Sequence, residues 1–176
     1  MPFTVQLDLH AAGASEIAKL SERLERIPNL ETVPRIGDVR HISLAVYEDL
    51  SVDRFLPDLA KFAAGVRPIV VQLANLGIFS GIRSVLFLGP VVTEELLALH
   101  RNFHDAFASF AGSCWEHYRP GLWVPHVTLA MNAEIAALQK AIAEVAEHWT
   151  PASMQLDAIR LIRFRPVQTI YRSALQ

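Results

Sequence analysis

The feature that most constrains the fold is a four-residue pattern that occurs twice. Residues 41–44 (HISL) and 126–129 (HVTL) each place a histidine two positions before a hydroxyl side chain, with aliphatic residues at the other two positions. Both segments are rich in the aliphatic residues typical of β-strands. Because side chains alternate between the faces of a strand, each segment presents imidazole and hydroxyl on one face and two aliphatic side chains on the other. The pattern therefore predicts two strands, each with one polar and one apolar face.

The elements around the two patterns follow the same order in each half of the chain. Each half predicts a helix, a histidine strand, a second helix and two further strands, and this repetition indicates a duplication with two pseudo-twofold-related lobes. We expect one domain over 1–176, with halves of about 15–90 and 91–176 and strand 3–9 added. Ser15, Thr93 and Asn132 are the expected helix caps. The predicted helices are 15–27, about 53–64, 93–111 and 133–148, and the predicted strands are 3–9, 41–47, 68–76, 84–89, 126–131, 154–164 and 167–174.

Composition narrows the class of protein. The chain has 176 residues, of which 52% are hydrophobic and 19% charged, so it can bury a substantial core and is not disordered in character. A single cysteine, Cys114, allows no internal disulfide. No apolar run reaches membrane-spanning length and the first residues do not resemble a signal peptide, so we expect a soluble cytoplasmic protein. The net charge of −2 argues against broad polyanion binding but allows a small phosphorylated ligand.

Two imidazoles facing each other across a pseudo-twofold axis suit phosphodiester chemistry. In-line attack at phosphorus needs a base on the nucleophile and an acid on the leaving oxygen. Two histidines with pKa values near ~6.5 can fill both roles at neutral pH. Hydroxyl groups can donate hydrogen bonds to the non-bridging oxygens, on which charge is held in the transition state. The pattern thus favours His41 and His126 as acid and base, and Ser43 and Thr128 as phosphate-binding groups, with no metal required.

At these residues the sequence resembles the two-histidine (2H) phosphoesterase superfamily, and within it the bacterial 2′-5′ RNA ligase and cyclic phosphodiesterase group. The hallmark of that family is a tetrapeptide of His, hydrophobic, Thr or Ser, hydrophobic, occurring twice about eighty residues apart. Here the separation between His41 and His126 is 85 residues. The resemblance covers nearly the whole chain, including the closing segment 159–175. The first motif departs from the usual form, with Arg40 where Pro is frequent and Ser43 where Thr is commoner.

The resemblance implies a bilobal α+β fold with an antiparallel sheet in each lobe, helices packed outside and the active site in a central cleft. It also implies metal-free hydrolysis of a 2′,3′-cyclic phosphate, or of a related cyclic or 2′-5′ phosphodiester in RNA or nucleotides, with 2′-5′ ligation as the reverse reaction. By family analogy His126 would activate the attacking water and His41 would protonate the leaving ribose oxygen. No cofactor and no obligate protein partner is implied.

Several other side chains are candidates for binding the substrate. Phe79 lies between two predicted strands, where this family often places an aromatic side chain near the nucleobase, and Tyr47 and Trp123 are further candidates for stacking on a base. Core packing is the alternative role for each of these aromatic residues. Arginine binds phosphate well, although an arginine on a strand face is often only solvated. The candidates of this type are Arg163, Arg165 and Arg172.

Two other hypotheses remain open at this point. The same fold could serve as a non-catalytic module that binds RNA ends or nucleotides. Alternatively, His100 and His104, spaced i and i+4 on a predicted helix, could bind a metal ion, although the sequence offers no matching third ligand. An amphipathic helix explains the same two histidines without a metal.

Overall fold

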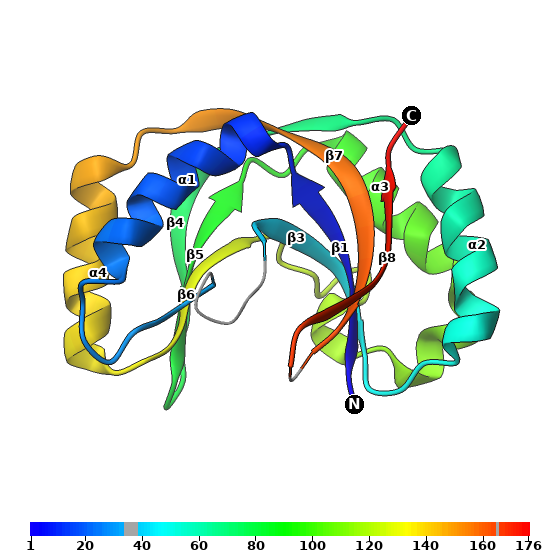
Figure 1. The fold of residues 1–176 in the computed structure, drawn as a ribbon, viewed down its shortest axis with the longest axis horizontal. Helices are drawn as coiled ribbons and strands as arrows, with labels where there is room; N and C mark the ends of the chain where they lie inside the picture. The colour runs from blue at the N-terminus through cyan, green and yellow to red at the C-terminus, as the bar shows by residue number, and fades with distance from the viewer. Residues whose placement is uncertain (34–38, 165) are drawn as a thin grey trace.

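A computed structural model describes residues 1–33, 39–164 and 166–176 as a sheet of eight strands covered by four α-helices (Figure 1). None of the helices formed by these residues is long and apolar enough to cross a membrane. The strands are β1 (Phe3–Leu9), β2 (Glu31–Thr32), β3 (His41–Tyr47), β4 (Ile69–Phe79), β5 (Ser84–Pro90), β6 (Val127–Ala133), β7 (Ala152–Arg163) and β8 (Gln168–Ala174). The helices are α1 (Ala11–Leu24), α2 (Val52–Ala64), α3 (Glu94–Ala106) and α4 (Ile135–His148), with 3₁₀ turns η2 (Ala108–Ser113) and η3 (Glu116–Tyr118).

The strands form one continuous antiparallel sheet, whereas the family resemblance implied a separate sheet in each lobe. The order is β2-β6-β5-β4-β7-β1-β3, with β8 added beside β7. The link between the two sides is the pairing of β4 with β7, from Ile69 opposite Leu156 to Leu73 opposite Ala152. The α+β class and the antiparallel pairing are as predicted. The sheet is continuous because β4 pairs with β7, which lies far from it in the sequence.

Each side of the sheet draws on both halves of the sequence. The hairpin β4–β5 from the first half pairs with β6, while β7 and β8 from the second half lie beside β1 and β3. The helices are exchanged in the same way, since α1 packs with α4 and α2 with α3 (Figure 1). The predicted halves, 15–90 and 91–176, are therefore interleaved in space, and their origin by duplication stays a prediction.

The helices cover the apolar face of the sheet. Ile42 and Leu44 on β3, and Val127 and Leu129 on β6, are fully buried in the same hydrophobic core. Burying an aliphatic side chain of this size stabilises a fold by roughly 1.5–3 kcal/mol. The aliphatic positions of both tetrapeptides thus anchor the two strands, and the alternation of a strand directs their histidines and hydroxyls to the face opposite the helices.

The outer edge of β3 is closed by two side chains and by a short stretch of backbone around Cys114, rather than by another long strand. Its backbone carbonyls at Ser43 and Leu44 accept hydrogen bonds from Trp123 Nε1 at 2.9 Å and His104 Nε2 at 3.2 Å. Farther along, Trp115 N donates to Val46 O at 2.8 Å. Satisfying an exposed strand edge in this way protects it from pairing with other chains and fixes the strand that carries His41.

The element boundaries confirm some sequence predictions and correct others. Thr93 caps α3 as predicted, because its Oγ1 accepts a hydrogen bond from Leu96 N at 3.2 Å. Ser15 and Asn132 were wrong as caps. The first helix already begins at Ala11, and Asn132 lies within β6 with a φ of 54°. The two-residue strand β2, which pairs with β6, carries too few residues for a strand pattern to show.

Candidate active site

His41 opens β3 and its ring is held by the backbone just before it. Nδ1 lies 2.7 Å from Val39 O. A carbonyl oxygen can only accept, so Nδ1 carries a proton and Nε2 is the atom that gains or loses one. Ser43 follows on the same face and is buried, with 8% of its surface exposed.

His126 stands immediately before β6 and repeats this arrangement. Its Nδ1 donates to Val124 O at 2.7 Å, again two residues earlier in the chain, so that Nε2 is left for chemistry. Thr128, two residues later on the same face of the strand, is partly exposed. Both motifs therefore present the same ring nitrogen, because each strand supplies the carbonyl that orients its own imidazole.

The structure brings the two histidines together although they come from strands far apart in the sheet order. Contacts between β3 and β6 join these two strands, which meet at the centre of the molecule (Figure 1). The pKa of His126 lies below the ordinary value for histidine, chiefly because the ring is buried and in smaller part because the charge of His41 disfavours a second positive charge. His126 therefore stays neutral more readily than an ordinary histidine.

The surroundings of the two rings differ. Phe79 and Phe87 pack against His126, with ring centroids 4.8 Å and 5.3 Å from the imidazole and 4.4 Å from each other. Phe79 is the last residue of β4 rather than a loop residue, and Phe87 pairs with Thr128 across β5 and β6. Phe87 was not among the predicted site residues, because its position beside Thr128 depends on how β5 pairs with β6.

Polar groups, in contrast, surround His41. In the register of the sheet, Asp8 of β1 lies opposite His41, and Gln6 lies opposite Ser43. Gln6 Nε2 donates a hydrogen bond to His41 Nε2 at 3.0 Å. Both side chains are almost completely buried, so the face of β1 that the alternating sequence places in solvent in fact lies beneath the site.

Asp8 is held by two arginines. Its carboxylate accepts from Arg160 Nε at 3.0 Å and from Arg172 Nε at 3.2 Å, and the Asp8 and Arg160 side chains are only 4% and 6% exposed. Burial raises the pKa of the Asp8 carboxyl, and this effect is opposed by Arg160, Arg172 and, least, His41. The sequence signal for this cluster was polar residues at alternate positions of strand 3–9, together with an arginine inside an aliphatic strand.

Arg40, which departs from the usual family pattern, has a structural role. Its side chain is buried and its guanidinium donates a hydrogen bond to Ser21 Oγ of α1. Ser21 in turn donates to Ile17 O at 2.9 Å within its own helix. Arg40 thus ties the start of β3 to the helix layer, on the side away from the His41 ring.

The predicted substrate-binding residues have different positions. Tyr47 was wrong as a base-stacking residue, because it is 1% exposed and packs in the core with its ring centroid 5.5 Å from that of Phe55. One face of Trp123 is covered by His100, at 3.9 Å and nearly parallel. Arg163 ends β7 and donates to Gln168 Oε1. Phe79 is the predicted aromatic residue that adjoins a motif histidine.

Of the other arginines considered, Arg172 is half-exposed and bound to Asp8, while Arg165 lies outside the described residues.

His100 Nε2 donates to Tyr118 O at 2.9 Å, and His104 Nε2 to Leu44 O. His104 therefore has a structural role at the edge of β3, and His100 has one at η3. Among the described residues, no group of three or more His, Cys, Asp or Glu side chains is placed to hold a metal ion.

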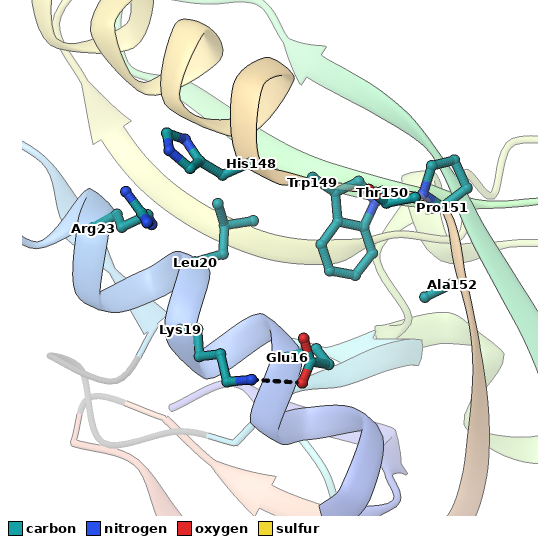
Figure 2. A pocket seen from close by; sticks show the side chains of 9 residues that line it. All are labelled: Glu16, Lys19, Leu20, Arg23, His148, Trp149, Thr150, Pro151 and Ala152. Atoms are coloured by element: carbon teal, nitrogen blue, oxygen red, sulfur yellow. Dashed lines mark hydrogen bonds and ion pairs between the residues drawn. The ribbon is translucent and has the colours of Figure 1, made fainter.

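Two cavities lie outside this region. The larger, of about 420 Å³, is bordered by α1 and the end of α4 (Figure 2). Its basic side chains already have carboxylate partners: Lys19 lies 2.9 Å from Glu16, and Arg23 and His148 lie 4.0 Å and 3.5 Å from Glu144. The second, of about 330 Å³, lies against the His100–Trp123 stack.

Comparison with known proteins identifies the family. The sequence model of the 2′-5′ RNA ligase superfamily matches residues 16–167. No curated protein sequence matches the chain.

Solved structures share the fold. Escherichia coli LigT complexed with 3′-AMP has a TM-score of 0.68 at 20% identity, covering 100% of this chain and 99% of LigT. The protein TT0787 of Thermus thermophilus has a TM-score of 0.67 at 18% identity, covering 99% and 98%. A structure described as a phosphoesterase has a TM-score of 0.66 at 20% identity, covering 99% and 97%. The chain belongs to the 2′-5′ RNA ligase superfamily.

Proposed function

We propose that this protein is a phosphodiesterase that opens 2′,3′-cyclic phosphates, or related cyclic and 2′-5′ phosphodiesters of nucleotides or RNA ends, by acid–base catalysis with His41 and His126. The observation that carries the proposal is the matched presentation of the two rings. In each, a backbone carbonyl two residues earlier binds Nδ1 and directs Nε2 to the reaction.

The different surroundings of the rings support one division of labour. His126, with its lowered pKa and its aromatic neighbours, is suited to act as the base. His41, beside the Asp8 carboxylate, is suited to hold a proton as the acid. In the proposed reaction a water oxygen bonds to phosphorus and gives its proton to His126 Nε2. The phosphorus–ribose oxygen bond breaks, and that oxygen takes the proton from His41 Nε2, which leaves a ribose monophosphate.

The hydroxyls supply the remaining requirement. Ser43 and Thr128 follow their histidines by two residues on the same strand faces, and in this proposal they would donate to the non-bridging oxygens of the phosphate. The relatives are consistent with such a ligand, since E. coli LigT structures were solved with 3′-AMP, phosphate, ATP and NADP+, each of which carries phosphate. In the reverse direction the same groups would form a 2′-5′ linkage.

The test is hydrolysis of a panel of 2′,3′-cyclic nucleotides, ADP-ribose cyclic phosphate and 2′-5′-linked oligonucleotides, with the position of the product phosphate assigned by phosphorus NMR. The wild-type protein should hydrolyse at least one of these substrates in the presence of EDTA. The His41→Ala and His126→Ala variants should each lose about 10²–10⁴-fold in rate. The His117→Ala variant, which changes a histidine of η3, is the matched control and should retain full activity. Binding without turnover across the whole panel would instead support the non-catalytic module.

A further inference from the structure

The contact between Gln6 and His41 is not explained by the stability of the fold alone. Gln6 is 1% exposed, at the centre of β1, with Ser43 opposite on one side and Arg160 on the other. An apolar side chain would fill this position without the cost of burying an amide. The glutamine instead places its side-chain nitrogen 3.0 Å from Nε2 of His41, the atom that would exchange a proton with substrate.

An amide can bind that atom in either protonation state. Neutral His41 carries its proton on Nδ1, bound to Val39 O, and its Nε2 accepts from the amide nitrogen of Gln6. When His41 is protonated, Nε2 becomes a donor and needs an acceptor. Rotation of the Gln6 amide about its last bond exchanges nitrogen for Oε1, which accepts. A glutamine side chain can therefore follow the histidine through its titration without carrying charge itself.

The charged groups that face His41 from neighbouring elements leave this role to a neutral side chain. Asp8 on β1 is opposite His41, but its carboxylate is bound by Arg160 from β7 and Arg172 from β8. His126, beside β6, adds a second ionisable ring, and Arg40, just before β3, is directed to Ser21. The charged groups named here include both a carboxylate and cationic side chains. The direct contact with His41 Nε2 is made by the neutral side chain of Gln6.

We propose that Gln6 is a positioning residue for the acid of the reaction: before substrate binds, its side-chain amide holds His41 Nε2 in both protonation states, and its Oε1 stabilises the protonated ring by accepting a hydrogen bond from Nε2–H, which the leaving ribose oxygen replaces when it takes the proton. This inference rests on the proposed function. The Gln6 amide acts through His41 and does not itself exchange a proton or form a bond with the substrate. Its loss should therefore lower kcat more than it raises KM.

Three variants test the proposal. Gln6→Met keeps the length and removes the hydrogen bond, so the pKa of His41 should fall by about 0.5–1 unit, because a hydrogen bond to a charged group is stronger than one to a neutral group. Gln6→Glu places a carboxylate at the same atom and should raise it by about 1 unit or more. Thr4→Val is the matched control, since Thr4 is also buried at 5% exposure on the polar face of β1 but pairs with Val46 and Ile162.

The measurements are an NMR titration of the His41 ring in each protein and kcat and KM on the best cyclic substrate. We expect Gln6→Met to lower kcat about 10-fold or more with KM within about threefold, and Thr4→Val to leave both quantities and the titration unchanged. An unchanged His41 titration and kcat in both Gln6 variants would overturn the proposal. If Gln6→Met fails to fold, an unchanged titration in Gln6→Glu alone overturns it. Because the titration needs no turnover, a shifted His41 in a protein that hydrolyses nothing would refute the proposed function and leave the positioning role standing.

Discussion

Gly77 is placed so that a single added methyl group should disturb the base side of the site. It lies directly opposite Phe87 in the β4–β5 register, and a Cβ at Gly77 would be 2.2 Å from the Phe87 ring. Non-bonded carbons keep about 3.5 Å or more, so the ring would have to retreat by about 1.3 Å. Phe87 packs against both Phe79 and His126, which lie in the direction of the site.

Gly77→Ala should therefore lower the free energy of unfolding by about 1–3 kcal/mol, the usual cost of overpacking. It should also reduce hydrolysis of a cyclic substrate, because the displaced ring presses on His126. Urea unfolding measures the first effect, and kcat/KM with the His126 NMR signal measures the second. Gly89→Ala is the control, since a Cβ there would meet the Asn75 Cβ at 3.4 Å, an ordinary contact. Equal stability of the two variants, with an unshifted His126 signal, would show that the Phe87 ring is not held between Gly77 and His126.

Three further predictions concern titration and charge. The pKa of His126 should be below the ordinary value and should rise in Phe79→Ala, which removes a ring that buries it, as NMR titration can show; an unchanged value would exclude burial as the cause. Burial lowers the pKa of His100 to about 4 from 6.5, so this residue contributes its full stability above pH 6.5, and about 3 kcal/mol should be lost as the pH falls toward 4. Unfolding measured against pH should show a flatter dependence in His100→Gln, and the same slope would contradict the assignment. Asp8→Asn leaves Arg160 without its buried partner and should lower the free energy of unfolding in urea by about 3 kcal/mol. Asp157→Asn, at a partly exposed pair with His10, should lower it by under about 1 kcal/mol. Similar losses in the two variants would mean that the Asp8 cluster is not a buried ion pair.

The parts of the site that could be predicted from the sequence are those set by local geometry. The i, i+2 spacing of His41 with Ser43 and of His126 with Thr128 places each pair on one strand face, whatever the rest of the fold. The aliphatic residues between them predict the buried face, and the structure buries them. Thr93 as a helix cap is local in the same sense.

What the sequence could not show depends on contacts between distant segments. Alternating apolar and polar residues, as in 3–9, are typical of a strand with one solvated face, but Gln6 and Asp8 are buried because β3 and β7 flank them and, with β8, bring His41, Arg160 and Arg172 to that face. The single sheet arises from the β4–β7 register. Tyr47 follows the first motif closely in sequence, yet its ring packs in the core. The pairing of β3 with β1 shifts register between the residues opposite Val5 and Gln6. This shift changes the face of β3 on which its later residues lie.

The roles proposed for His126 as the base and His41 as the acid should both be visible in the pH dependence of kcat/KM. In the wild-type protein the profile should be bell-shaped, with the ascending limb given by deprotonation of His126 and the descending limb by deprotonation of His41. In His126→Ala the residual activity should lose the ascending limb, and in His41→Ala it should lose the descending limb. Persistence of both limbs in both variants would show that the two histidines are not the acid and the base.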